Sequence, residues 1–369
     1  MVKLGTRMVT SGPYTLDMEA LSAFAGDVAA LRREGCEVAL VSSGAIAAGM
    51  GRMQIRNRPK SVPELQALAA VGQNLLMDAY DLAFRKLDIP IGQVLLTIDD
   101  INSRKRFVNV KNAFEELFRM DVVPIINEND PVGTEEVKVG DNDNLSAYVA
   151  GLINADLLIL LTDVDGLYDC HPSEEGACVI PLVEHITPDI EKSCGGAGDK
   201  AAVGGMRTKI EAAKRVLSAG SMMLIAHGRK NRLTDLVHGE ETGTLFRPTV
   251  NGLTARRHWI KTTAKVRGKL TVDAGAVRAI LEKNASLLPT GITGVQGTFD
   301  IGDVVAVTGP DGDEIARGVV QYDHREIGKI RGLHSAEIDD ILGYDNGSEV
   351  IHRNDLVNIR QVNTGGTVS

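Results

Sequence analysis

The sequence predicts an α/β protein with a mostly parallel, open sheet sandwiched by helices, followed by a small β-rich domain. Short apolar segments alternate with segments of helical period from Val2 to Ala226. This alternation is typical of a parallel sheet covered by helices on both faces. After about Thr249 the pattern changes to short β segments that are broken by Gly and Asp, which indicates hairpins in a smaller domain.

The predicted strands are short and apolar, as expected for strands that are buried on both faces. They are Val2–Leu4, Val38–Val41, Ile91–Thr97, Val122–Ile126, Leu157–Leu161 and Met222–Ala226. The predicted helices carry apolar residues at helical spacing, and Gly35 is placed to end the first of them. They are Thr15–Glu34, Glu64–Leu87, Arg104–Met120, Asn144–Ile153 and Lys209–Leu217.

The C-terminal third divides into a linker and a small domain. Residues 251–267 are polar and basic and contain the only tryptophan, Trp259. A helix is predicted over Asp273–Lys283, with β segments at Val304–Val307 and Ile315–Val320. We therefore expect a first domain over residues 1–250, a linker over 251–267, a β-rich domain over 268–363 and a frayed tail over 364–369.

Composition and charge exclude several classes of protein. The net charge of −9 disfavours nucleic acid and anionic membrane surfaces as partners. The N-terminus has no apolar core of a secretory signal, and no apolar run reaches the roughly 18 residues of a membrane span. The cysteines Cys36, Cys170, Cys178 and Cys194 form no CxxC pair or zinc spacing. Together these features predict a cytoplasmic protein.

Polar clusters follow several predicted strands, where ligands bind in parallel sheets. Ser42-Ser43-Gly44, Asn127–Asp130 and Thr162-Asp163 each come directly after a strand, and Gly140–Asn144 comes before a helix. Turn formation and helix capping explain either Asn/Asp cluster alone. Both clusters together favour a site for an ammonium group, a metal-bound phosphate, or both.

Two further segments suggest phosphate binding. Lys3-Leu4-Gly5-Thr6 places a lysine and a glycine at a strand end, although a surface lysine before a turn is a common alternative. Residues 195–209 form a glycine-rich segment that ends at Lys209 before a helix, and its backbone N–H groups are suited to phosphate unless it is only a surface loop. The P-loop, GxGxxG and protein-kinase signatures are absent.

These motifs resemble the glutamate 5-kinases of the amino acid kinase family. The segments that carry the resemblance are Lys3–Thr6, Val41–Ile46, Ile126–Asp130, Val139–Ser146, Leu161–Asp163 and Gly204–Lys209. Further on, Leu287–Ile292, Gly302–Val305 and Ile341–Tyr344 look like the C-terminal PUA domain that many of these enzymes carry. The resemblance implies an amino acid kinase fold, a PUA-like domain, and ATP-dependent phosphorylation of the glutamate side-chain carboxylate in proline biosynthesis.

The resemblance also implies roles for individual residues. Lys3, Lys209 and Asp143 match catalytic positions, with the aspartate holding the two lysines. Glutamate-binding positions are matched by Ser43, Asp130 and Asn142. Nucleotide-binding positions are matched by Lys3, Gly5, Thr6, Thr162, Asp163, Val203, Gly204, Gly205, Met206, Arg207, Thr208 and Lys209. Mg²⁺ is expected with ATP, but no residue is assigned as a metal ligand. Proline is a candidate feedback inhibitor, and a homo-oligomer, either a dimer or a tetramer, is expected.

Three features depart from the family pattern. Only Met1 and Val2 precede Lys3, Arg7 stands where a serine is common, and Val203 replaces a frequent threonine. A strand in a sheet usually has about five or six residues. We therefore expect an incomplete first strand that holds Lys3 loosely, in an enzyme that is weakened or shortened at its start.

Other functions are compatible with parts of the sequence. Within the family, the alternatives are kinases of aspartate, acetylglutamate, carbamate or a nucleoside monophosphate, and an inactive regulatory relative is a further one. An RNA-binding protein is an alternative from another class, because PUA domains occur in such proteins. From Gly268 onward there are nine Lys/Arg against fifteen Asp/Glu, which is the wrong balance for an RNA surface.

Overall fold

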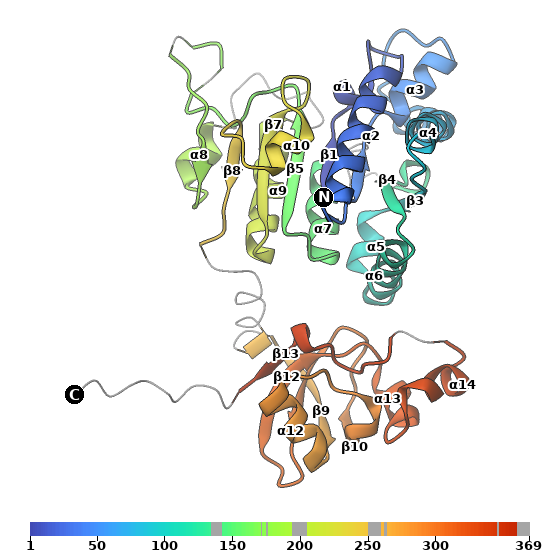
Figure 1. The fold of residues 1–369 in the computed structure, drawn as a ribbon, viewed down its shortest axis with the longest axis vertical. Helices are drawn as coiled ribbons and strands as arrows, with labels where there is room; N and C mark the ends of the chain where they lie inside the picture. Colours follow the sequence, from blue (N-terminus) through green and yellow to red (C-terminus); the bar gives the residue numbers. More distant parts are fainter. Residues whose placement is uncertain are drawn as a thin grey trace, which may run out of the picture. The chain divides into compact units, whose positions relative to one another are not determined.

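The computed structural model describes residues 1–133, 142–170, 172–174, 176–193, 205–249, 260–261, 264–344 and 347–359. The chain divides into two compact units (Figure 1). The first comprises residues 1–101 and 113–249, and the second comprises residues 102–112 and 250–369. The predicted tail and most of the predicted linker, including Trp259, lie outside the described residues.

The first unit is built on an eight-stranded sheet in which all neighbouring strands but one pair are parallel. In spatial order the strands are β3 (Ile91–Leu96), β4 (Val123–Glu128), β2 (Leu40–Ser42), β1 (Val2–Leu4), β5 (Leu157–Thr162), β7 (Met222–His227), β8 (Thr244–Phe246) and β6 (Leu182–Val183). Only β7 and β8 run antiparallel. The predicted mostly parallel sheet is confirmed.

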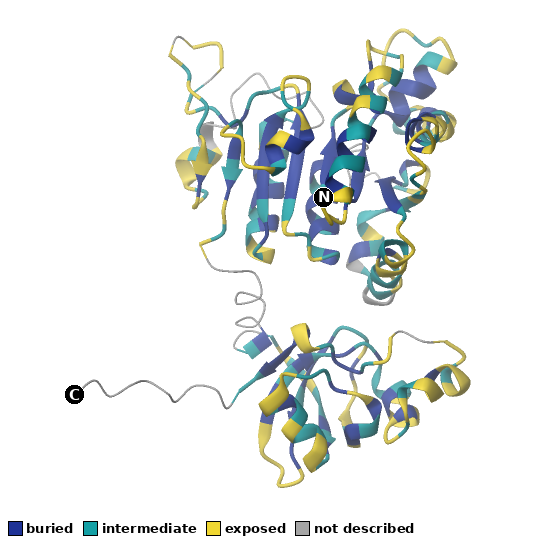
Figure 2. Cartoon of the chain, viewed as in Figure 1, coloured by how far each residue is buried: buried dark blue, intermediate teal, exposed yellow. Residues whose placement is uncertain are grey.

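Helices cover both faces of this sheet. They are α1 (Thr6–Val9), α2 (Met18–Arg33), α3 (Ala45–Arg52), α4 (Val62–Arg85), α5 (Ile98–Asn102), α6 (Arg104–Arg119), α7 (Asn142–Leu152), α8 (Pro188–Ser193), α9 (Met206–Ala219) and α10 (Leu233–Val237), with a 3-10 turn at Asp130–Val132. One core cluster joins the sheet to α2 and α4, and another joins it to α7 and α9. Figure 2 shows the buried strands between these partly exposed helices.

The alternation of side chains along β1 sets the position of its lysine. Val2 and Leu4 point into the core formed with α2 and α4. Because successive side chains of a strand point to opposite faces, Lys3 faces the side of α7 and α9. The strand has three residues, yet it pairs with β2 and β5 along its whole length. The short strand is as predicted, but a loosely held Lys3 is wrong, since this side chain is buried and ion-paired.

The second unit contains a five-stranded sheet with its own core. Its strands are β10 (Ile292–Gly297), β9 (Val266–Val272), β11 (Val304–Thr308), β12 (Glu314–Val319) and β13 (Leu356–Asn358) in spatial order. The helices are α12 (Ala274–Lys283), α13 (His324–Ile330) and α14 (Ile338–Leu342), with 3-10 turns at Pro289–Gly291, Ser335–Glu337 and Arg353–Asp355. Strand β9 begins two residues before the predicted boundary at Gly268, and that boundary stays a prediction.

Most predicted elements of the first unit are present, with ends that differ by a few residues. Two differences matter for the site. Helix α3 was not predicted, because its short run of alanines and glycines has little amphipathic pattern. Helices α7 and α9 begin at Asn142 and Met206, earlier than predicted, so Asp143 and Lys209 lie within helices. Within the described ranges, no helix combines the length and apolar character needed to cross a bilayer.

Close contact between α3 and α4 depends on two glycines. A Cβ atom on Gly72 would lie 1.8 Å from the carbonyl oxygen of Ala45, and one on Gly49 would lie 2.0 Å from that of Leu68. Side chains at these positions are sterically excluded, so the two backbones can touch. The contact fixes the position of the start of α3, which lies two residues after Ser43.

We predict that Gly72→Ala lowers the free energy of unfolding by about 1–3 kcal/mol, because overpacking must separate the two helices. Gly26→Ala in α2 is the matched control. A Cβ there meets nothing within 4 Å, so the better helix propensity of alanine should stabilise the protein by up to about 1 kcal/mol. Urea unfolding of both variants measures the difference, and equal effects would contradict the close-contact explanation.

Candidate active site

The predicted site residues gather at the carboxyl ends of neighbouring strands. Gly5 and Thr6 follow β1, Ser43 follows β2, Asp130 follows β4 and Thr162 ends β5. Strands β4, β2, β1 and β5 are consecutive in the sheet. This edge is where open parallel sheets bind ligands, so the segments that the sequence separates by up to 157 positions share one side of the molecule (Figure 1).

Asp143 lies between two lysines from distant parts of the chain. Lys3 Nζ is 2.6 Å from its Oδ1, and Lys209 Nζ is 3.0 Å from its Oδ2. The hydroxyl of Thr208 also donates to Oδ2, at 2.8 Å. Asp143, Lys3 and Lys209 are all buried. Strand β1 and helices α7 and α9 each supply one member of this cluster, which matches the arrangement that the resemblance implied.

Opposing effects act on the charge of Asp143. Burial alone would raise the pKa of its carboxyl group, but the charges of Lys3 and Lys209 and their hydrogen bonds hold that pKa at about 2. The carboxylate is therefore ionised at neutral pH. Two buried ammonium groups thus flank one carboxylate, an arrangement that suits an anionic phosphoryl group.

Ser43 and Asn142 form a second group at the end of β2. The side-chain amide of Asn142 donates to the Ser43 hydroxyl and to the backbone carbonyl of Ser42, each at 3.0 Å. Between Ser43 and α3, Gly44 has φ 110°, in the left-handed region that favours glycine. The turn at Gly44 allows α3 to begin at Ala45, two residues after the serine. Ser43 and Asn142 are thus brought together as predicted.

Besides Oδ1 of Asp143, which is ion-paired with Lys3, two buried side-chain oxygen atoms in this region have no hydrogen-bond partner among the described residues. They are Oδ1 of Asp130 and Oδ1 of Asn142. Buried polar groups in folded proteins are almost always paired, so an unpaired acceptor is expected to be completed by a ligand. A ligand group with several N–H donors, such as an ammonium group, fits two acceptors of this kind.

The carboxyl group of Asp130 is poised to titrate near neutral pH. Burial and the nearby charge of Glu128 raise its pKa to about 7, although Arg58 acts in the opposite direction. A binding group with a pKa shifted this far is typical of a functional site.

The nucleotide-binding residues that were predicted are only partly brought together. Arg7 forms an ion pair with Asp163, which links the segment after β1 to the end of β5. Thr162 donates to the carboxylate of Asp163 at 3.1 Å. Gly205 precedes α9, which carries Met206, Arg207, Thr208 and Lys209. Val203 and Gly204 lie outside the described residues, as does the glycine-rich run at 195–202. Gly140 and Asp141 also lie outside them.

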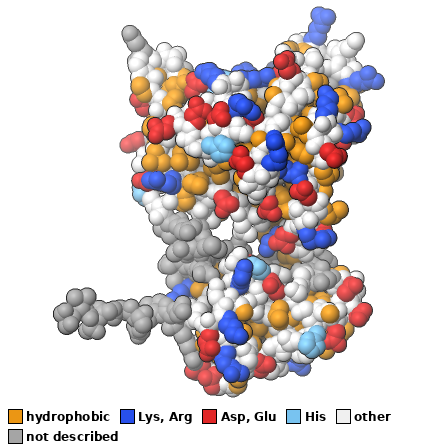
Figure 3. Space-filling model, in the orientation of Figure 1, with side chains coloured by type: hydrophobic (Ala, Val, Ile, Leu, Met, Phe, Trp, Pro, Cys, Tyr) orange, Lys and Arg blue, Asp and Glu red, His pale blue; other side chains and the backbone are white. Residues whose placement is uncertain are grey.

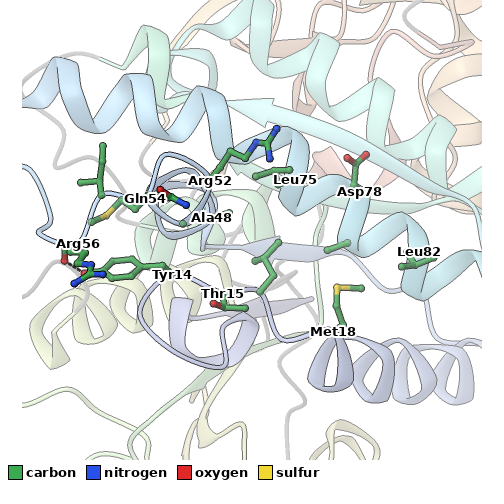
Figure 4. A pocket seen from close by; sticks show the side chains of 15 residues that line it. Tyr14, Thr15, Met18, Ala48, Arg52, Gln54, Arg56, Leu75, Asp78 and Leu82 are labelled. Atoms are coloured by element: carbon green, nitrogen blue, oxygen red, sulfur yellow. Dashed lines mark hydrogen bonds between the residues drawn. The ribbon is translucent and has the colours of Figure 1, made fainter.

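Two cavities lie near this edge. One of about 780 Å³ is lined by Thr6, Arg7, Arg58 and Arg229, among others, and so adjoins the predicted site. The other, of about 850 Å³, lies beside α3 and α4, and the residues that line it include none of the predicted site residues (Figure 4). In Figure 4, Arg52 of α3 and Asp78 of α4 are drawn at this second cavity.

Several side chains that hydrogen-bond to residues at or near the site were not identified from the sequence. Gln73 and Tyr80 of α4 hydrogen-bond to Asn127 and Ser42. Arg229 donates to the backbone carbonyls of Arg7 and Thr10, at 3.0 and 2.8 Å, and so ties α1 to the end of β7. Gln73 and Tyr80 lie seven residues apart in α4, but this spacing alone does not reveal their partners.

Comparison with known proteins identifies the family. A family model described as "Amino acid kinase family" matches residues 1–227. The chain belongs to the amino acid kinase family. A second model, for the PUA domain, matches residues 268–342. The first match covers the whole sheet edge described above, and the second covers most of the second unit.

Curated relatives in this family cover nearly the whole chain. A glutamate 5-kinase of Trichlorobacter lovleyi is 47% identical over 97% of this chain and 96% of its own length. Glutamate 5-kinases of Syntrophotalea carbinolica and Geobacter sulfurreducens are 46% and 45% identical over the same shares. The aligned share of this chain is large enough to extend into both of its family-matched regions.

We predict that Asp143→Asn lowers the free energy of unfolding by about 3–5 kcal/mol, because two buried lysines lose their shared counter-charge. Asp165→Asn is the control, since Asp165 pairs with Lys230 at an exposed position and its loss should cost at most about 1 kcal/mol. Urea unfolding at neutral pH provides the comparison. If the two variants were equally stable, the buried cluster would not contribute as proposed.

Proposed function

We propose that this chain is an ATP-dependent glutamate 5-kinase, which transfers the γ-phosphoryl group of ATP to the side-chain carboxylate of glutamate. The product is glutamyl 5-phosphate, and the reaction is the first step of proline biosynthesis. The observation that carries the proposal is the buried cluster of Lys3, Asp143 and Lys209, in a chain of the amino acid kinase family whose curated relatives are named glutamate 5-kinases.

The reaction needs alignment and charge neutralisation rather than a general base. A glutamate side chain has an ordinary pKa near 4.3, so the attacking carboxylate is already ionised at neutral pH. Lys3 and Lys209 neutralise the phosphoryl oxygens, and Asp143 keeps the two ammonium groups apart and oriented. Gly5, Thr6, Thr162, Asp163 and the segment from Val203 to Lys209 bind the nucleotide.

The acceptor is oriented by groups at the ends of β2 and β4. The unpaired oxygens of Asp130 and Asn142 receive the ammonium group of glutamate, and the Ser43 hydroxyl lies beside them. Holding the ammonium group in this way positions the side-chain carboxylate of the same glutamate for attack. A correctly placed nucleophile can supply a large part of the rate enhancement.

Mg²⁺ neutralises charge on the β- and γ-phosphates when it is bound together with ATP. Among the described residues, no group of three or more His, Cys, Asp or Glu side chains is arranged to hold a metal ion. In this proposal the chain contributes the lysine pair, and the cation enters with the nucleotide, as Mg²⁺ commonly does.

We further propose a cytoplasmic location, a homo-oligomer and feedback inhibition by proline, all from the resemblance. The PUA-like unit is not proposed to bind RNA. Acidic and basic side chains are intermixed on the face of the molecule that Figure 3 shows, and Asp and Glu outnumber Lys and Arg from Gly268 onward.

The direct test is ADP release from the full chain with glutamate as the only acceptor. Acyl phosphate formed in the same reaction is trapped as the hydroxamate with hydroxylamine. Aspartate, N-acetylglutamate and carbamate serve as alternative acceptors. Rapid turnover with one of these, together with none with glutamate, would replace the proposed substrate within the same reaction class.

The charge of Asp130 should control glutamate binding. Because its pKa is about 7, the glutamate KM should fall as pH rises through neutrality, where the carboxylate forms. Asp130→Asn should raise the glutamate KM about ten- to a hundredfold at pH 8 and remove its dependence on this group, with the ATP KM little changed. Steady-state kinetics at several pH values measure both effects.

Asp130→Asn should weaken glutamate binding but make the folded protein more stable at pH 8. A raised pKa means that the folded state retains a proton that the unfolded chain releases above its ordinary value of 3.8. Stability therefore falls as pH rises from 3.8 to about 7 and the full loss persists above. Asp130→Asn should accordingly melt at a higher temperature than the parent at pH 8. A lower melting temperature would argue against a strained, substrate-dependent carboxylate.

The proposed domain division predicts that a chain ending at Thr249 folds and phosphorylates glutamate. The site residues assigned above all precede this position, and the two units have separate hydrophobic cores. Cooperative thermal unfolding and the coupled assay test the truncated chain. A soluble but inactive product would show that the second unit contributes to catalysis, and loss of oligomerisation alone would assign it an assembly role.

A further inference from the structure

Helix α4 presents a row of polar side chains toward the acceptor end of the site. Gln66, Gln73 and Tyr80 are spaced seven residues apart, which places them on one face of the helix. Gln66 Nε2 donates to the carbonyl of Gly133 at 3.0 Å, and Tyr80 Oη donates to Ser42 Oγ at 2.8 Å. Gln73 lies between them and contacts a different partner.

Gln73 fixes the orientation of the amide group of Asn127. Its Oε1 accepts a hydrogen bond from Asn127 Nδ2 at 2.8 Å. The opposite atom of that amide, Oδ1, then accepts from the backbone N–H of Glu128 at 2.9 Å and from Asn142 Nδ2 at 3.0 Å. An amide that turned over would set its oxygen against Gln73 Oε1 and its N–H group against the Glu128 N–H and Asn142 Nδ2, so Gln73 is one of three contacts that favour this orientation.

Asn127 passes this orientation on to Asn142. The Nδ2 group of Asn142 faces three acceptors, which are the Ser42 carbonyl, the Ser43 hydroxyl and Asn127 Oδ1. Its Oδ1 is left buried and has no partner in the described part of the chain. The site therefore presents an oxygen acceptor at this position rather than an N–H donor.

We propose that Gln73 is a positioning residue that acts through Asn127 to hold Asn142 as a hydrogen-bond acceptor for the ammonium group of the acceptor substrate. This inference rests on the proposed function and assigns the source of its selectivity for an α-amino acid. Without the acceptor at Gln73, only the Glu128 N–H and Asn142 Nδ2 hold the Asn127 amide, so its turned-over orientation becomes less unfavourable and the orientation of Asn142 is less firmly specified.

Two substitutions at Gln73 separate this role from simple packing. Gln73→Met has a similar length but no strong acceptor, whereas Gln73→Glu keeps acceptor oxygens toward Asn127. The test measures the KM for glutamate and the inhibition constant of glutarate, which retains both carboxylates but lacks the ammonium group. Gln73→Met should raise the glutamate KM about ten- to a hundredfold and leave glutarate inhibition and the ATP KM unchanged.

Gln73→Glu should keep the ratio of glutamate to glutarate affinity at the parent value or above it. Tyr80→Phe is the matched control, because it removes a hydrogen bond from the same helix face to the site without interrupting the amide chain. It should leave the ratio unchanged. If Gln73→Met proves insoluble, the Gln73→Glu measurement still tests the inference, because a fall of the ratio in that variant would overturn it.

Three results would overturn the inference while the parent enzyme phosphorylates glutamate. Equal weakening of glutamate and glutarate by Gln73→Met would show a packing effect, as would a fall of the ratio in Gln73→Glu. A fall in Tyr80→Phe as large as that in Gln73→Met would show a general loss of polar contacts. Failure of the parent chain to release ADP with glutamate would instead refute the proposed function.

Discussion

A single buried carboxylate holds together the parts of the chain that form the candidate site. Asp143 pairs with Lys3 from the first strand and with Lys209 from a helix more than two hundred residues later. Ionised groups are buried only at a large desolvation cost, and each partner is stable here only because the others are present. The relative positions of β1, α7 and α9 are therefore coupled to one electrostatic cluster.

The acceptor end of the site depends on a different constraint, the close contact of α3 and α4. Gly49 and Gly72 allow the two helix backbones to touch, and α4 then forms hydrogen bonds with the last residues of β2 and β4 and with the segment after β4. Backbone contact fixes a separation more tightly than long side chains can. The polar groups on α4 accordingly reach their partners at 2.8 to 3.0 Å, and hydrogen bonds of this length restrict the amide orientations.

Much of the fold could be predicted because local pattern and topology agree. The strands before the polar clusters are short apolar runs, and βα alternation requires their carboxyl ends to share one edge. Helix α3 was missed because its sequence, AIAAGMGR, is short and contains two glycines, which are poor helix formers; its apolar pair, Ile46 and Met50, packs against α4. The C-terminal strands β9 and β10 were missed because glycines and charged residues interrupt their alternation, and β13 was missed because it has only three residues.

The candidate site was predicted through the motifs, but its supporting residues could not be. Lys3, Asp143 and Lys209 stand in recognisable segments, whereas Gln73 stands in a helix whose composition is ordinary. A polar residue on the core face of a helix is informative only once its partner is known. The loose attachment expected for Lys3 was wrong for the same reason, because strand length was considered without the ion pair that holds the side chain.

The two ends of the site differ in how they use buried charge. At the phosphoryl end, Asp143 and its lysines satisfy one another, and this end is stable without substrate. At the acceptor end, Asp130 and Asn142 keep unpaired oxygens, and the raised pKa of Asp130 records the cost of ionising it without a counter-charge. An ammonium group offsets that cost on binding, whereas a substrate without an ammonium group does not. In the proposed function, selectivity for an amino acid follows from leaving this end incomplete in the free protein, while the completed lysine cluster keeps the reacting groups in place.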